Sequence, residues 1–226
     1  MNTKQIGLSG STLKLIAIIA MLIDHVGAGI FPYIWWYRYI GRLTMPIMCF
    51  FIAEGFQKTS NVKAYAVRLL IFALLSEIPF QIYFHLRGNV LFTLLAGLLF
   101  IWAWRDIKNQ AHAYGVMALI LIAVSIPGYE PDYGLLGVAM VALAWIAYRN
   151  GFPLSFRAMG PAVICGLGNA AGGLPAPLIY WPMIAGLLLC LYNGKRGFSM
   201  KYLFYAFYPL HLLALWFIRS YILHRI

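Results

Sequence analysis

The chain has 226 residues, of which 63% are hydrophobic and 10% charged, and its mean hydropathy is +0.80, which excludes an ordinary soluble domain. Its 17 Lys and Arg residues and 6 Asp and Glu residues give a net charge of +11. The basic residues lie mostly between apolar runs rather than in one patch, so they indicate membrane topology and argue against nucleic-acid binding.

The apolar runs predict an all-α fold, a polytopic transmembrane helix bundle that forms a single membrane domain over residues 1–226. Only helices and closed barrels can span a bilayer, and the runs lack the alternation of barrel strands. A crossing needs roughly 20 residues. About nine helices are expected, near 13–31, 39–56, 64–84, 90–104, 114–127, 133–148, 156–172, 176–192 and 203–221. Eight helices result if the Gly-rich run 156–172 is re-entrant, and ten remain possible.

Basic loops alternate with uncharged ones along the chain. The loops with Lys or Arg carry Lys58, Lys63, Arg105, Lys108, Arg149, Lys195, Arg196 and Lys201, whereas the turns 128–132 and 172–176 have none. By the positive-inside rule, this pattern predicts an inner-membrane protein with a cytoplasmic N-terminus and an outer C-terminus. Arg38 and Arg87 then lie on the outer side as exceptions.

The three cysteines, Cys49, Cys165 and Cys190, lie within apolar runs without metal-ligand spacing. We expect them to be small buried hydrophobes, and we expect no metal site.

The first predicted helix, 13–31, carries Lys14 near its cytoplasmic end and the pair Asp24 and His25 in its outer half. Eleven residues at about 100° each place Lys14 and His25 on one face, about 16 Å apart along the axis. Ionisable groups are expensive inside a bilayer and mark functional sites. Asp24 and His25 form either a structural pair or a catalytic site, in which the carboxylate orients an imidazole that acts as general base.

The second predicted helix, 39–56, contains Arg42 toward the outer side and Glu54 near the inner end, with a kink expected at Pro46. Arg42 is a candidate to bind an anionic group or to pair with Asp24. The alternative is that it extends to the outer interface.

Polar residues recur in three later predicted helices. Arg68 and Glu77 lie within 64–84, where the helix breaker Pro79 follows Glu77 two residues later, and Asn89 and Thr93 lie one turn apart at the start of 90–104. His211, in the last helix, is a second histidine candidate for the site, or else a hydrogen-bonded interior residue. Most Trp and Tyr residues, including the run 35–37 and Trp181, are expected in the interfacial belts.

These residues form motifs that together resemble the TraX family: LK-x9-DH, GR-x3-P, SE-x-PF, N-x-x-F-T and FYPLHLLAL, in that order. From about residue 106 to 200 only the hydrophobicity matches. The resemblance implies a bacterial integral membrane acetyltransferase, whose named member acetylates the N-terminal alanine of F-type pilin during conjugative pilus assembly. A looser similarity extends to multi-spanning membrane acyltransferases with a first-helix His preceded, eleven residues earlier, by a polar or basic residue.

The resemblance implies acetyl-CoA as donor and a pilin or another surface molecule as acceptor. Basic residues of the inner face, Lys14 among them, would bind the donor's phosphates. His25 would accept the proton of the attacking amine, Asp24 would orient the imidazole, and Arg42 or Asn89 would stabilise the oxyanion. An acetyl-histidine intermediate is a variant of this mechanism.

The alternatives are a glycan acetylase, a non-catalytic pilus-assembly protein and a small transporter that uses the same charges as a relay. The sequence shows no internal repeat of the kind that marks many transporters.

Overall fold

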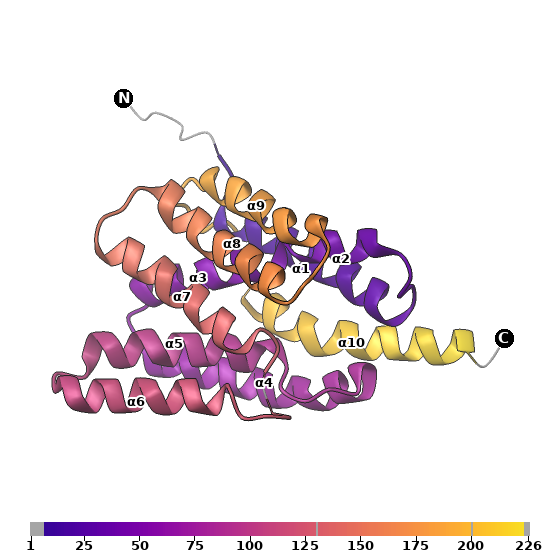
Figure 1. The fold of residues 1–226 in the computed structure, drawn as a ribbon, viewed down its shortest axis with the longest axis horizontal. Helices are drawn as coiled ribbons and strands as arrows, with labels where there is room; N and C mark the ends of the chain where they lie inside the picture. The colour runs from indigo at the N-terminus through magenta and orange to yellow at the C-terminus, as the bar shows by residue number, and fades with distance from the viewer. Residues whose placement is uncertain (1–6, 130, 200, 224–226) are drawn as a thin grey trace.

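The computed structural model describes residues 7–129, 131–199 and 201–223, and in these residues the regular elements are helices (Figure 1). Nine helices of 14 to 23 residues and one short helix, α2, follow in order: α1 (Gly10–Gly29), α2 (Trp35–Gly41), α3 (Thr44–Lys58), α4 (Val62–Phe84), α5 (Val90–Asp106), α6 (Gln110–Ala123), α7 (Gly134–Arg149), α8 (Leu154–Ala171), α9 (Ala176–Cys190) and α10 (Lys201–Leu223). The predicted all-α fold is confirmed.

The predicted helix 39–56 is wrong in detail, because the chain turns at Arg42 and forms α2 and α3 in its place. Pro46 does not kink a continuous helix. It lies in the first turn of α3, where backbone N–H groups have no partner within the helix and the missing donor costs nothing. The turn brings Gly41 against Asp24, and any Cβ at position 41 would overlap the Asp24 carboxylate.

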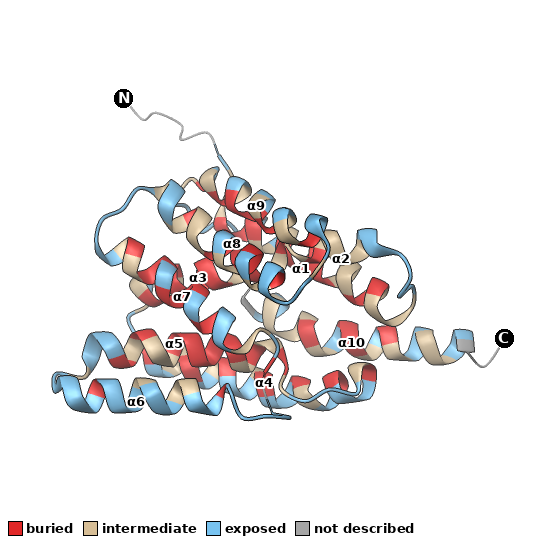
Figure 2. Ribbon diagram, in the orientation of Figure 1, coloured by how far each residue is buried: buried red, intermediate tan, exposed pale blue. Residues whose placement is uncertain are grey.

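Helix α3 lies at the centre of the bundle and packs against α1, α5, α7, α8 and α9. Most of its side chains are buried, including Met45, Ile47, Cys49 and Phe56. Figure 2 shows buried residues concentrated on α3, α5 and α7, whereas α6 and the far end of α10 are largely exposed. The core therefore forms around α3.

Exposed apolar stripes cover the outside of the bundle. On α4, for example, Ile71, Leu74, Leu75 and Ile78 are 47–68% exposed. Water does not solvate such a stripe favourably, but lipid hydrocarbon covers it without cost. Helices α1, α4 and the Tyr202–Ile222 part of α10 are long and apolar enough to cross a membrane, and α6, α7 and α9 are shorter apolar helices. The nine-crossing topology stays a prediction.

The bundle has two distinct ends. At one, the starts of α1, α4 and α10 and the end of α3 meet around a shared cavity lined by Lys14, Lys58, Arg68 and Phe204. We call this the Lys14 end. At the other, the His25 end, the second half of α1 meets the last turn of α4.

Glu77 joins α4 to the start of α5. Its Oε1 accepts hydrogen bonds from the Gly88 backbone N–H (2.8 Å) and the Gln81 side chain (3.0 Å), and its Oε2 accepts from the Asn89 backbone (3.1 Å) and side-chain amide (2.8 Å). A carboxylate at a helix N-terminus also interacts favourably with the helix dipole. Glu77 therefore has a structural function. Pro79, two residues after it, lies within α4 and does not end the helix, which continues to Phe84.

We expect Glu77→Gln to destabilise the bundle, because a neutral amide would replace one acceptor oxygen with a donor that faces other donors. The expected loss is about 1–3 kcal/mol, the range for hydrogen bonds to charged groups. Thermal unfolding in detergent would measure it, with the exposed α4 residue Leu74 changed to Ala as control. An unchanged Tm for Glu77→Gln, or an equal loss in the control, would contradict this role.

Candidate functional site

Asp24 and His25 point to different partners. The Asp24 Oδ2 atom forms an ion pair with Arg38 of α2 at 2.8 Å, whereas the His25 ring contacts His211 of α10. Successive helical residues project about 100° apart, which explains the divergence. The structure does not bring the two neighbours together, and Asp24 does not orient the His25 imidazole as the sequence led us to expect.

His25 and His211 form a hydrogen-bonded pair between the first and last helices of the bundle. His25 Nδ1 lies 2.7 Å from His211 Nε2, and His211 Nδ1 lies 2.8 Å from the Phe207 carbonyl oxygen. The carbonyl can only accept, so His211 Nδ1 carries a hydrogen. In the neutral ring its Nε2 is then an acceptor, and His25 Nδ1 must donate to it. This chain of hydrogen bonds leaves the lone pair of a neutral His25 on Nε2.

Aromatic side chains enclose the pair. His25 and His211 are only 8% and 6% exposed, and the Phe84 ring packs edge-on against His25 with ring centres 5.0 Å apart. The Tyr83 hydroxyl donates to the His25 carbonyl at 2.7 Å. A Cβ at Gly29 would overlap this hydroxyl, so glycine is needed there for α1 and α4 to approach. The imidazole that retains a free lone pair is thus held in a dry, rigid setting.

Arg42 pairs with Tyr133 and not with Asp24. Its Nη1 donates to the Tyr133 hydroxyl at 2.9 Å, so the predicted Asp24–Arg42 pair is wrong and Arg38 fills that role. Tyr133 itself has a left-handed backbone, with φ of 66°, which is unusual for a tyrosine. Two buried atoms here have no hydrogen-bond partner in the described residues: Asp24 Oδ1 and Arg42 Nε.

Lys14, Glu54 and Arg68 lie together at the Lys14 end and line its cavity. Glu54 is buried and forms an ion pair with Lys58, one turn later on α3, at 2.7 Å. The helical rise puts Lys14 about 16 Å from His25 along α1. The buried residues Ile18 and Met21 lie between them on the same stripe. Lys14 therefore does not share a site with His25, although it shares its face of the helix.

Asn89 and Thr93 form hydrogen bonds that stabilise the fold. The Asn89 amide donates both hydrogens, to the Ala73 carbonyl and to Glu77, and its oxygen accepts from the Leu91 N–H. With its hydrogen-bonding groups in use and no exposed surface, Asn89 has no free donor for an oxyanion, which corrects that expectation. Thr93 donates to the Asp132 carbonyl and holds the loop before α7.

Sequence reasoning missed Arg38 and Arg196 as site residues. In the sequence both indicate membrane topology only, and Arg38 lies on the outer side as an exception to the positive-inside rule. This exception is the signal that could have identified Arg38. An arginine on the outer side departs from the positive-inside rule, and a nearby carboxylate, here Asp24, explains its position. No group of three or more His, Cys, Asp or Glu side chains within the described part of the chain is arranged to hold a metal ion.

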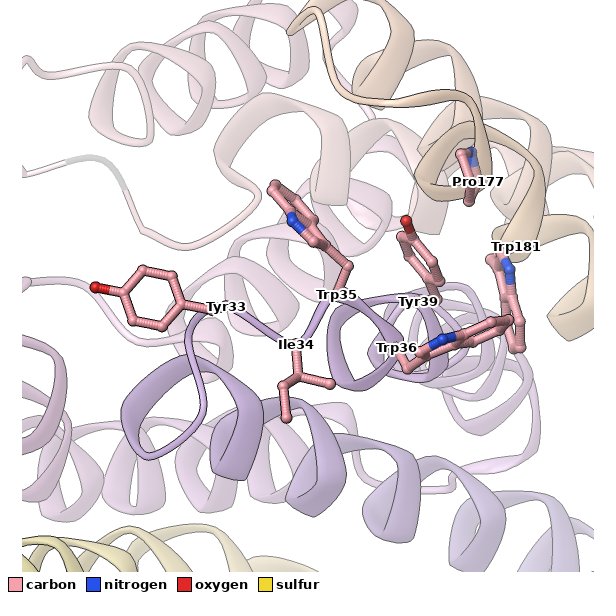
Figure 3. A pocket seen from close by; sticks show the side chains of 7 residues that line it. All are labelled: Tyr33, Ile34, Trp35, Trp36, Tyr39, Pro177 and Trp181. Carbon is pink, nitrogen blue, oxygen red and sulfur yellow. The ribbon is translucent and has the colours of Figure 1, made fainter.

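A shallow hollow of about 620 Å³ lies between α2 and the start of α9, and Figure 3 shows its aromatic side chains. Trp36, Tyr39 and Trp181 gather there, with the Trp36 and Tyr39 rings each within 6.3 Å of Trp181 between centres. Trp36 is 64% exposed. Exposed Trp and Tyr side chains are typical of a membrane interface, so the interfacial belt stays our prediction for this cluster.

The fold and the site define a polytopic helical membrane protein with a buried histidine pair at one end and a basic cavity at the other. The chain belongs to the TraX family, whose model, described as TraX protein, matches residues 9–219. A probable fimbrial assembly protein, FimC, of Dichelobacter nodosus is 32% identical over 94% of this chain and 96% of its own length. An uncharacterised protein of Rickettsia prowazekii is 32% identical over 61% of this chain and 55% of its own. No solved structure matches significantly.

The partner of Asp24 can be tested by double-mutant cycles. We expect Asp24→Asn and Arg38→Gln to show a coupling energy of about 0.5–3 kcal/mol, as contacting residues do. Asp24→Asn and Arg42→Gln should couple more weakly, because Arg42 bonds to Tyr133. Unfolding by denaturant in mixed micelles gives the energies. Stronger coupling of Asp24 to Arg42 than to Arg38 would contradict the observed pairing.

Proposed function

We propose that this protein is an acetyl-CoA-dependent N-acetyltransferase of the bacterial inner membrane, with its N-terminus in the cytoplasm. It moves an acetyl group to an acceptor at the outer face, which we take to be the N-terminal amine of a pilin. The observation that carries the proposal is the His25–His211 pair, which leaves a buried imidazole with a free Nε2 lone pair. Membership of the TraX family and the printed name of the Dichelobacter nodosus relative support a role in pilus or fimbrial assembly.

The chemistry that fits this pair is acyl transfer with general base catalysis. The acceptor nitrogen attacks the thioester carbonyl carbon, an N–C bond forms, and His25 Nε2 takes the proton that the nitrogen loses. The C–S bond then breaks, and the departing thiolate of CoA receives the proton from His25. His211 acts as a positioning residue, because its Nε2 accepts the His25 Nδ1 hydrogen and so fixes the tautomer.

Negative charge that develops on the carbonyl oxygen needs a donor. Of the two residues expected from the sequence, Asn89 has no unused N–H, whereas the Nε of Arg42 has no partner in the described residues. We therefore assign the oxyanion role to Arg42, with Tyr133 holding its Nη1. Asp24 neutralises Arg38 beside this group.

A second function is supported by the name of the fimbrial relative, namely a non-catalytic assembly protein. Such a protein would use the histidine pair only to join α1 to α10. It would tolerate loss of the His25 imidazole wherever the bundle stays folded, and it would not need acetyl-CoA. Activity of a folded His25 variant separates the two functions.

We expect His25→Ala to lower acetyl transfer at least about 100-fold, the lower limit for loss of a general base. The assay is transfer of labelled acetyl from acetyl-CoA to a peptide with a pilin N-terminus, by the purified protein in liposomes. His112→Ala, an exposed histidine on α6, is the matched control. Full activity of a folded His25→Ala protein would refute the catalytic assignment and leave the assembly function.

We expect His211→Gln to keep more activity than His211→Leu, because glutamine supplies an oxygen that accepts the His25 Nδ1 hydrogen and leucine supplies none. The pH profile of kcat should shift in His211→Leu, since the tautomer of the base is no longer fixed. Equal activities and unchanged pH profiles for the two variants would rule out a positioning role.

The acceptor is identified by mass spectrometry of the host's pilins and surface glycans, with and without the gene. Loss of 42 Da, the approximate mass of one acetyl group, from a pilin N-terminus is the expected result. Loss from a glycan instead would reassign the acceptor to the glycan class while retaining acetyl transfer.

A further inference from the structure

A cavity of about 490 Å³ opens at the Lys14 end, about 16 Å along α1 from the histidine pair. The starts of α1, α4, α5 and α10, the end of α3 and the segment 192–198 after α9 enclose it. Six separate parts of the chain thus converge on one concave space. Such convergence is typical of a ligand site rather than of a packing defect.

The charges on the cavity wall are strongly unbalanced. Four basic side chains, Lys14, Lys58, Arg68 and Arg196, line it together with one acidic side chain, Glu54, which gives a net charge of +3. Lys58 neutralises Glu54 at 2.7 Å. The remaining three cations have no carboxylate within ion-pairing distance in the described residues.

The three unbalanced cations have weak partners in the protein. Lys14 Nζ lies over the rings of Phe51 and Phe204, 4.9 and 5.9 Å from their centres. Arg68 is hydrogen-bonded to the uncharged Tyr205 side chain, and its Nε atom is buried without a hydrogen-bond partner in the described residues. Arg196 makes one long bond, 3.4 Å, to the Ser199 hydroxyl. Positive charge that is partly desolvated and left unneutralised favours an anion with several charges.

The aromatic and apolar residues of the cavity wall indicate which chemical groups accompany the anion in the ligand. Aromatic side chains surround the cations, among them Tyr65, Tyr192 and Tyr205. Aromatic faces and guanidinium groups stack on planar bases. Toward the bundle interior the wall becomes apolar, with Met48 and Leu94, and can take an uncharged chain. The cavity therefore suits a phosphorylated planar base that carries a neutral arm.

We propose that this cavity binds the phosphorylated nucleotide head of coenzyme A, with Lys14, Arg68 and Arg196 as phosphate partners. The identity of the ligand rests on the proposed acetyl transfer, whereas the basic, aromatic character of the site, which suits an anionic planar ligand, does not. The arm of the donor points along the stripe of α1 toward His25, where Ile18 and Met21 must move aside. Arg105 and Arg149, which the sequence also places in inner loops, do not line the cavity.

Binding of CoA without any acceptor tests the site directly. The full-length protein is placed in nanodiscs of zwitterionic lipid, and the Kd of CoA is measured by thermophoresis. We expect Arg68→Gln and Arg196→Gln each to weaken binding about tenfold or more, the loss of one charge-assisted hydrogen bond. Arg68→Lys should lose less, and Arg149→Gln, an exposed arginine outside the cavity, should be unchanged. Pantetheine, which lacks the phosphorylated base, should not bind measurably.

The outcomes distinguish failure of the proposed CoA site from failure of the proposed acetyl transfer. An unchanged Kd in folded Arg68→Gln and Arg196→Gln proteins overturns the cavity assignment, even if acetyl transfer by the wild type is established. Cavity-dependent CoA binding without transfer to any acceptor retains the site and overturns the reaction. Displacement of CoA by phosphatidylglycerol added to the nanodiscs, with binding of the lipid at least as tight, overturns the nucleotide assignment in favour of a lipid phosphate.

Discussion

Lipid hydrocarbon offers no hydrogen-bond partners, and this constraint organises the polar residues of the bundle. Most polar side chains buried here satisfy one another: Glu77 and Asn89 bond the α4–α5 turn, and Glu54 pairs with Lys58. Six buried side-chain atoms of the described residues do not, and an unpaired polar atom is costly in such a setting. Three of them, Arg68 Nε, Arg42 Nε and Asp24 Oδ1, lie in the regions where we place chemistry and ligands, whereas Ser76 Oγ, Trp145 Nε1 and Arg157 Nε lie elsewhere.

Helix α1 connects the two functional regions that we propose. Its first turns present Lys14 to the basic cavity, and its last turns present His25 to His211. The separation suits a donor with a charged head and a long neutral arm, because the head can stay at the polar end while the reactive group reaches a dry base. It also keeps the cations of the cavity about 16 Å along α1 from the imidazole that must accept a proton.

The ion pair between Asp24 and Arg38 has a different function from the one the sequence led us to expect. It joins α1 to α2 directly beside the turn at Arg42, where Gly41 allows the close approach. Arg42 is thereby left to bond Tyr133 rather than a carboxylate. The Arg42 Nε atom keeps an unused N–H in the described residues, and such a donor is what the oxyanion role proposed for Arg42 requires.

The sequence by itself determined the helical class, the helix positions to within four residues for all but the second, and the stripe that carries Lys14 and His25. These features depend on hydrophobic run length and helical period, which are local. Only the tertiary structure decided that His25 bonds to His211, that Asp24 pairs with Arg38, and that Arg68 and Arg196 share a cavity with Lys14. These contacts join residues distant along the chain or across a turn, and the packing of helices around α3 selects among many partners that spacing alone leaves open.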